Sequence, residues 1–273
     1  MSGVKLAVPL AGPVVDTHCH MDVNFDDEHV LPNVDDAMAA AKSVNVTKVI
    51  QVGCDVASSK WAARAALDHP DVWATVALHP NAAAHDPDLE NSLAAIADLA
   101  QLPQVRGIGE TGLDYYRTEE SQSAAQHVSF RAHIDIARNA GKPVIIHDRD
   151  AHKDVIKTLE SYGAPETVVF HCFSGDAEMA KLCAQAGWYM SIPGVVTFKN
   201  AQQLRDAVLE IPDNLLLVET DSPFLTPAPN RGHANASTNI PWTVRAICEV
   251  RGQSEQEICE LLFSNAARVF GPF

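Results

Sequence analysis

The feature that most constrains the fold is an alternation that runs through all 273 residues of the chain. Short runs of β-branched and other apolar residues are separated by segments in which apolar residues recur at helical spacing, as Phe130, Ile134 and Ala137 do. About eight such strand–helix units in succession predict an α/β fold, a (β/α)₈ TIM barrel that forms one domain over residues 1–273. The predicted strands are Val14–His20, Lys48–Gly53, Val72–His79, Val105–Glu110, Pro143–His147, Thr167–His171, Trp188–Ile192 and Leu215–Asp221.

Turn and capping residues agree with this prediction. Gly141 follows a helical segment directly before a strand, as a glycine that ends a helix does. After the last strand, Pro241–Arg251 and Ser254–Phe270 are predicted helices, and Ser254 with Glu257 predicts a capping box. The main alternative is an open doubly wound sheet, but no Gly-x-Gly-x-x-Gly motif follows the first strand.

Side chains that commonly bind metals stand at the ends of five predicted strands. The first strand ends in His18, Cys19 and His20, and side chains two apart on a strand share a face, so the two imidazoles point together. The carboxyl ends of parallel barrel strands converge on one rim. We therefore predict a site for one or two divalent cations at that rim. Its predicted ligands are His18, His20, Glu110, His147, His171 and Asp221.

A packing role is the alternative for each histidine. A single histidine at a strand end is more often hydrogen-bonded in the core, and one His-x-His pair arises easily among 12 histidines. Chance explains five such strand ends poorly. Six further histidines fall in predicted loops or helices and are expected to be packing or surface residues: His29, His69, His85, His127, His133 and His152.

The charge balance excludes one broad class of partner. Asp and Glu number 35 against 20 Lys and Arg, which gives a net charge of −15 and argues against a protein that coats duplex DNA through a basic face. An enzyme that holds a few phosphates through bound cations remains open, because cations add charge that the sequence does not count. The cysteines form no Cys-x-x-Cys pair, and no targeting or membrane-spanning segment is evident. We expect a cytoplasmic monomer with no membrane contact and no obligate protein partner.

Short motifs, most of them at the strand ends, indicate a specific protein family. They are DTHCHMD (Asp16–Asp22), LHP (Leu78–Pro80), GETGLDYY (Gly109–Tyr116), VIIHDRD (Val144–Asp150), HCFSG (His171–Gly175), ETDSP (Glu219–Pro223) and SNAARVF (Ser264–Phe270). In identity and order along the chain they resemble the signature blocks of the TatD family of metal-dependent deoxyribonucleases.

The resemblance implies an amidohydrolase-like barrel with two divalent ions, Mg²⁺ in the cell or Mn²⁺, Zn²⁺ or Ni²⁺ in its place. By matching position, one ion is expected to bind His18, His20, Glu110 and Asp221, and the other Glu110, His147 and His171. Members of the family hydrolyse DNA phosphodiesters, commonly as 3′→5′ exonucleases on single strands. Some act instead on aminoacyl-tRNA esters.

The expected reaction is hydrolysis of a phosphodiester by metal-activated water. Asp221 is the candidate to orient that water and accept its proton, and Glu110 is the candidate bridge between the ions. Four other side chains are candidates to contact single-stranded DNA: two arginines for phosphates, a tyrosine for stacking on a terminal base, and a serine of the HCFSG block. They are Arg149, Arg231, Tyr115 and Ser174, with Tyr116 as the alternative stacking residue.

The sequence departs from the family after the last predicted strand. The family often reads RGKxNEP there, whereas this chain has RGHANAS at positions 231–237 and lacks the Lys and the Glu. Because this loop is expected to border the substrate groove, an aminoacyl-tRNA deacylase and a small-molecule amidohydrolase remain alternatives. A third alternative, a scaffold with a structural metal, is least favoured because closed structural sites are usually rich in cysteine.

Overall fold

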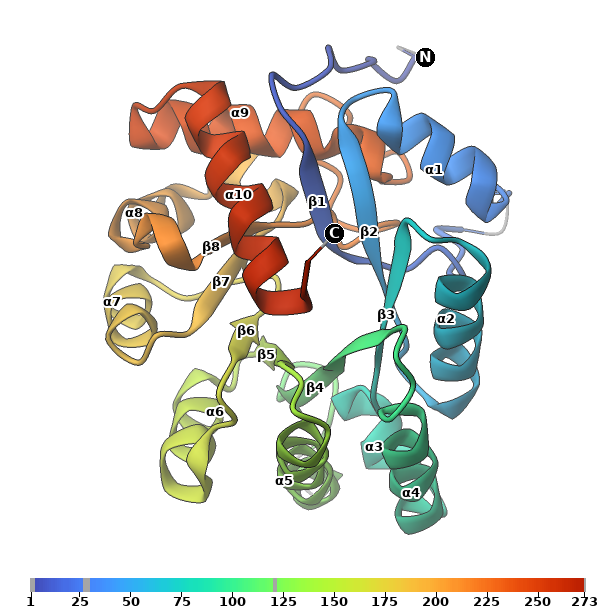
Figure 1. Ribbon diagram of the computed structural model, residues 1–273. Coiled ribbons are helices and arrows are strands. Elements are labelled where there is room, and N and C mark those ends of the chain that lie inside the picture. The colour runs from blue at the N-terminus through green and yellow to red at the C-terminus, as the bar shows by residue number, and fades with distance from the viewer. Residues whose placement is uncertain (1–2, 27–29, 120–121, 273) are drawn as a thin grey trace. The chain divides into compact units, whose positions relative to one another are not determined.

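The computed structural model describes residues 3–26, 30–119 and 122–272, so the prediction for His29 lies outside the described residues (Figure 1). All eight predicted strands are present, and helices alternate with them along the chain. The strands are β1 (Val14–Cys19), β2 (Val46–Val52), β3 (Val72–Val76), β4 (Val105–Asp114), β5 (Val144–Arg149), β6 (Val168–Phe170), β7 (Tyr189–Ile192) and β8 (Leu216–Val218). The helices are α1 (Val34–Lys42), α2 (Val56–Asp68), α3 (Pro80–His85), α4 (Leu89–Leu99), α5 (Ser123–Ala140), α6 (His152–Thr158), α7 (Ala177–Gln185), α8 (Gln202–Glu210), α9 (Ile240–Arg251) and α10 (Glu255–Phe270).

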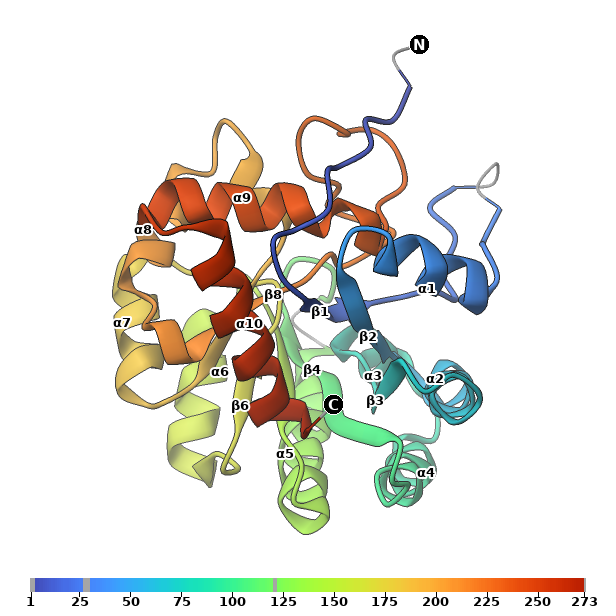
Figure 2. The same cartoon turned by 45° about the horizontal axis from the view of Figure 1, so that its top comes forward.

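The chain divides into two compact units. The first contains the residues up to Ile50 and those from Gly175 onward, and the second runs from Gln51 to Ser174. In the second unit, β3, β4, β5 and β6 pair in parallel in that order, while α2 packs on β3 and α5 on β4. In the first unit, β7 pairs in parallel with β8, and α10 packs on β1 and β8 (Figures 1 and 2).

Eight parallel strands, each followed by helical structure, define the (β/α)₈ class, and the fold class predicted from the sequence is confirmed. Every residue of β1, β3, β6 and β8 is buried. Strands of a parallel sheet are covered on both faces, which is why β6 and β8 are apolar at every position. The predicted apolar face of α5, which packs on β4, is fully buried at Phe130, Ile134 and Ala137.

The predicted helix ends are also observed. Gly141 ends α5 with a φ of 61°, a left-handed conformation that glycine adopts without steric cost. At the start of α10, the Ser254 hydroxyl accepts from the Glu257 backbone N–H, and the Glu257 carboxylate accepts from the Ser254 N–H, so the capping box is confirmed.

The structure corrects the end of the fourth strand. The sequence predicted that it stops at Glu110, but β4 continues to Asp114 and stays paired with β5 through Gly112 and His147. A Cβ atom at Gly112 would lie only 2.1 Å from the His147 carbonyl oxygen, so a glycine is required for this close approach.

Across the three described ranges, no helix is both long and apolar enough to cross a membrane.

Candidate metal centre

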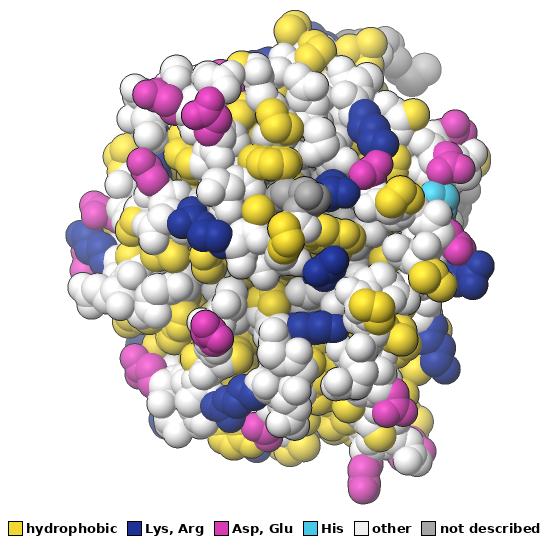
Figure 3. Space-filling view, viewed as in Figure 1, with side chains coloured by type: hydrophobic (Ala, Val, Ile, Leu, Met, Phe, Trp, Pro, Cys, Tyr) yellow, Lys and Arg dark blue, Asp and Glu magenta, His cyan; other side chains and the backbone are white. Residues whose placement is uncertain are grey.

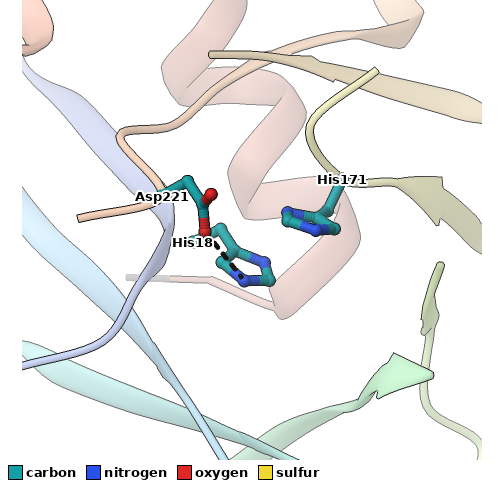
Figure 4. Close-up of side chains that lie close together, drawn as sticks. All are labelled: His18, His171 and Asp221. Atoms are coloured by element: carbon teal, nitrogen blue, oxygen red, sulfur yellow. Dashed lines mark ion pairs between the residues drawn. The ribbon is translucent and has the colours of Figure 1, made fainter. Parts of the chain in front are cut away.

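Three predicted ligands of the first unit gather at the ends of β1 and β8, and we call them the His18 cluster: His18, His20 and Asp221. The Nε2 atoms of the two imidazoles lie 3.2 Å apart. One carboxylate oxygen of Asp221 lies 3.9 Å from His18 Nε2 and 3.5 Å from His20 Nε2. Figure 4 shows the first of these ion pairs. Cys19 points the other way, its thiol donating to the Ile50 carbonyl, so the predicted alternation along β1 is confirmed.

A buried carboxylate fixes the backbone around the His18 cluster. Asp16 accepts hydrogen bonds from the Thr220 backbone N–H at 2.9 Å, the Thr220 hydroxyl at 2.7 Å and the Ser237 hydroxyl at 2.7 Å. Burial raises the pKa of Asp16 to about 6, although these hydrogen bonds act to lower it. One side chain thus joins β1, the segment after β8 and the RGHANAS loop.

The backbone of Asp221 is unusual in a way that often marks functional sites. Its φ is 56°, in the left-handed region that residues other than glycine seldom adopt, although Asp tolerates it better than most. Its N–H donates to the His18 carbonyl at 2.9 Å, which holds the turn against β1. The carboxylate is thereby directed at the two imidazoles.

Around one buried carboxylate, the second unit forms a group that we call the Glu110 cluster: His79, Glu110, His147 and His171. One Glu110 oxygen lies 2.7 Å from His147 Nδ1, 3.2 Å from His171 Nε2 and 3.3 Å from His79 Nε2. Glu110 lies within β4 and His147 within β5, while His79 and His171 follow the ends of β3 and β6. Four consecutive parallel strands of the sheet thus each contribute one side chain.

His147 lies between two carboxylates. Its Nε2 is 3.3 Å from an Asp114 oxygen, and its Nδ1 faces Glu110. Burial acts to lower the pKa of His147, but the hydrogen bonds with Asp114 and Glu110 outweigh it and raise that pKa. Burial acts to raise the pKa of Asp114, and hydrogen bonds from His147 and the Arg117 backbone hold it well below its usual range. A histidine that binds a metal commonly donates its other ring N–H to a carboxylate in this way.

His79 and Asp114 were not among the candidate site residues predicted from the sequence. His79 ends a predicted strand within the LHP motif, so the same strand-end argument could have included it. Asp114 gave no such signal, because it lies four residues beyond the predicted strand end and only the continuation of β4 brings it to His147.

The donor atoms of both clusters suit divalent cations. Ligand atoms at about 2.1 Å from an ion are about 3.0 Å apart at right angles and about 3.4 Å apart at a tetrahedral angle. The distances within the His18 cluster are 3.2, 3.5 and 3.9 Å, and the Glu110 oxygen lies 2.7–3.3 Å from its three imidazole nitrogens. Imidazole nitrogen and carboxylate oxygen together accept Mg²⁺, Mn²⁺, Zn²⁺ and Ni²⁺.

Both arginines predicted to contact phosphates stack on aromatic rings. The Arg149 guanidinium carbon is 4.0 Å from the centroid of the Tyr116 ring, and that of Arg231 is 3.7 Å from the Phe198 ring. Stacking of this kind holds a guanidinium in a fixed plane and leaves its edge N–H groups to bind an anion.

The two tyrosines that follow β4 differ in their surroundings. The Tyr115 hydroxyl donates to Asp154 at 2.8 Å and lies 2.9 Å from His127 Nε2, whereas the Tyr116 side chain is 64% exposed. These contacts favour Tyr116 over Tyr115 as a stacking surface. The predicted contact Ser174 is exposed, and its hydroxyl donates to the Asp148 carbonyl at 3.4 Å.

Comparison with known proteins identifies the family. The model of the family described as TatD related DNase matches residues 15–271. The chain belongs to the TatD family. As a TatD-family member it is a metal-dependent hydrolase, and the family suggested by the sequence motifs is confirmed.

TatD relatives cover almost the whole chain. The metal-dependent hydrolase TatD of Mycobacterium tuberculosis is 42% identical over 94% of this chain and 98% of its own length. YabD of Bacillus subtilis is 36% identical over 93% and 98%. Among solved structures, the TatD homologue YjjV of Escherichia coli has a TM-score of 0.87 at 25% identity, covering 94% of this chain and 97% of its own. A TatD-family hydrolase of Entamoeba histolytica matches the fold with a TM-score of 0.84 at 19% identity, covering 97% and 100%.

Proposed function

We propose that the chain is a divalent-metal-dependent deoxyribonuclease that hydrolyses phosphodiester bonds from the 3′ end of single-stranded DNA. The observation that carries the proposal is the single Glu110 oxygen that lies within 3.3 Å of three imidazole nitrogens. A carboxylate in such a position can bind two cations, and paired cations stabilise in-line displacement at phosphorus. In this proposal the His18 and Glu110 clusters serve one two-ion centre, and membership of the TatD family supports it.

Bound cations would activate water and offset the negative charge that develops on the phosphoryl oxygens. His18, His20 and Asp221 would hold one cation, and Glu110, His147 and His171 the other, with Glu110 shared between them. Asp221 would orient the attacking water and accept its proton, since one of its carboxylate oxygens lies 3.5 Å from His20 Nε2 and 3.9 Å from His18 Nε2. Arg149 and Arg231 bind phosphate oxygens.

The test combines metal analysis with end-labelled DNA. The purified protein is assayed on single strands that carry the label at the 3′ or the 5′ end, with Mg²⁺, Mn²⁺, Zn²⁺ and Ni²⁺ in turn. Early release of the 3′ label, dependent on added cation, supports the proposal. Release from the 5′ end first would contradict the direction, and cleavage in excess chelator would contradict the metal requirement.

Glu110→Gln is the matched variant, because it keeps the size of a side chain that is 4% exposed and removes its charge. We expect loss of about 100-fold or more in turnover, with a melting temperature in chelator close to that of the wild type. Glu160→Gln, an exposed glutamate of the same unit, serves as control and should change neither. Retention of activity by Glu110→Gln on every substrate would show that the two-metal mechanism is wrong.

The loop after β8 favours a second candidate. It carries His233 where the RGKxNEP pattern has Lys, so a cation that would contact a phosphodiester is missing from this loop. Hydrolysis of another ester or amide, by an aminoacyl-tRNA deacylase or a small-molecule amidohydrolase, is this candidate. Aminoacyl-tRNA and a lactone panel assayed beside DNA distinguish the two by their relative kcat/KM.

A further inference from the structure

A pocket of about 250 Å³ adjoins the His18 cluster within the first unit. Three segments form its wall: the residues after β1, helix α1 and the RGHANAS loop. His20 lines the pocket and also belongs to the His18 cluster, and Ser222 of the wall is the neighbour of Asp221. A group bound in the pocket would therefore lie beside the proposed reaction centre.

The chemistry of the wall favours an uncharged group over a phosphate. Most of the lining is apolar, including Met21, Leu31, Met38 and Val49, and no Lys or Arg is among the described residues that form it. Asp36 adds a carboxylate, which would repel an anion and can accept a hydrogen bond from an amino group. The wall thus suits an uncharged, largely apolar group that carries N–H donors.

The size of the pocket is sufficient for a bicyclic ring. An apolar protein cavity of about 150 Å³ holds benzene, which has six heavy atoms. By proportion, 250 Å³ holds about ten heavy atoms, the number in adenine. Methionine side chains adapt to flat rings and make favourable sulfur–aromatic contacts, and two of them line this pocket.

We propose that this pocket binds the terminal nucleobase of the strand whose phosphodiester is hydrolysed, with purines preferred. The proposal rests on the proposed function and deepens it. It assigns recognition of the terminal base to side chains that, apart from His20, bind neither cations nor phosphates.

The RGHANAS loop keeps the pocket open. Asn235 is buried and fixes the loop, because its amide donates to the carbonyls of Thr220 and Phe224 at 2.9 and 2.7 Å and its oxygen accepts from Asn239 at 3.0 Å. Ala234 and Ala236 on either side line the pocket with single methyl groups. At position 236 the RGKxNEP pattern carries Glu, which would add both bulk and negative charge to the wall.

Ala236→Glu is therefore the test variant, and His233→Glu is its control. Both add a carboxylate at an exposed position of the same loop, but only Ala236 lines the pocket. Binding of adenosine, which has no phosphate, is measured by calorimetry. We expect the Kd to rise about tenfold in Ala236→Glu and to change less than about twofold in His233→Glu. The nucleobase assignment would be overturned if wild type and Ala236→Glu bound adenosine with the same Kd. It would also be overturned if the wild type bound hexanamide, an aliphatic amide without a ring, more tightly than adenosine.

Turnover of two dinucleotides separates this proposal from the proposed function. One carries a terminal adenine and the other an abasic sugar at the same end. The pair is made twice, once with the difference at the 3′ end and once with it at the 5′ end. We expect the wild-type KM to be about tenfold lower for the adenine substrate, with similar kcat, and Ala236→Glu to lose this difference. Hydrolysis of both substrates with one KM would overturn the pocket assignment and leave the nuclease in place. Adenosine binding without hydrolysis of either substrate would support the pocket and overturn the nuclease.

Discussion

At the scale of single residues, the series Glu110–His147–Asp114 gives the clearest prediction for metal binding. Both ring nitrogens of His147 face a carboxylate, at 2.7 Å and 3.3 Å. If Nδ1 binds a cation beside Glu110, Asp114 is the group that sets the tautomer and the ring orientation. Asp114 is then a positioning residue that acts through His147.

Asp114→Asn should weaken divalent metal binding about 10- to 100-fold. The reason is that the amide keeps the size of the side chain, and its oxygen can still accept from the backbone of Tyr116 and Arg117, while the charge beside His147 is lost. Competition of the protein with a chromogenic chelator measures the metal affinity directly.

The control is Asp148→Asn on β5. The Asp148 carboxylate faces His152 Nδ1 at 2.7 Å instead of His147. The Asp148→Asn variant should bind divalent metal with an affinity within about twofold of the wild type. If Asp114→Asn also retained wild-type affinity, Asp114 would have a structural role only.

At the scale of elements, one histidine joins α5 to the segment after β3. His133 is fully buried, its Nε2 accepts from the Leu78 N–H at 3.0 Å, and its Nδ1 lies 2.7 Å from the Ser129 carbonyl. These two backbone partners require a neutral ring with the proton on Nδ1. Burial lowers the pKa of His133 to about 4, and the bond to Ser129 only partly opposes this.

The lowered pKa of His133 predicts a loss of stability in mild acid. Above pH 6.5 the ring is neutral in both folded and unfolded chains, so its contribution is fully present. As the pH falls from 6.5 towards 4, the unfolded chain binds a proton that the folded chain does not, and the free energy of unfolding decreases by about 3 kcal/mol from this residue. Urea unfolding at pH 7, 5.5 and 4.5 measures the loss.

His133→Gln provides the comparison. Its amide cannot titrate in this range, so the variant should be less stable at pH 7 but should lose less stability than the wild type between pH 7 and 4.5. Parallel curves for both proteins would show that His133 does not contribute to the acid sensitivity.

How much of the fold and the candidate site could be predicted is clearest at the strand ends. Apolar runs bounded by turn residues indicated all eight strands. The alternation along the first strand also predicted that His18 and His20 share a face and that Cys19 points the other way, because the two-residue period of a strand is a local property. The extension of β4 to Asp114 was not predictable, since it depends on pairing with β5, a contact between segments over 30 residues apart. The pocket beside His20 was not predictable for the same reason, because its wall combines α1 with the loop after β8, which are far apart in the sequence.

At the scale of the whole molecule, the charge is unusual for a protein proposed to bind nucleic acid. The net charge is −15, and on the face drawn in Figure 3 the Lys and Arg side chains lie interspersed with other side chains. An enzyme that engages one strand end needs few phosphate contacts. Among the described residues, Arg149 and Arg231 are the two that the proposal assigns to this role.

The salt dependence of binding should therefore be shallow. On single-stranded oligonucleotides, the logarithm of the binding constant should fall against the logarithm of salt concentration with a slope that corresponds to about two to three phosphates. Fluorescence anisotropy from 50 to 300 mM salt, with the cation concentration held constant, measures it. A slope that corresponds to six or more phosphates would reveal an extended binding surface and contradict recognition of an end alone.

The shared position of His20, in the wall of the pocket and in the cluster beside it, bears on how such enzymes diversify. Side chains of α1 that line the pocket, and Ala234 and Ala236 of the loop, can be exchanged one at a time without touching the proposed metal ligands, so a duplicated gene could acquire a new preference through very few mutations. Substitutions of His20 itself would be selected against, because they would impair both the proposed metal binding and the proposed base binding. Sequence variation among descendants of one ancestor should then concentrate on the outer wall and stop at this imidazole.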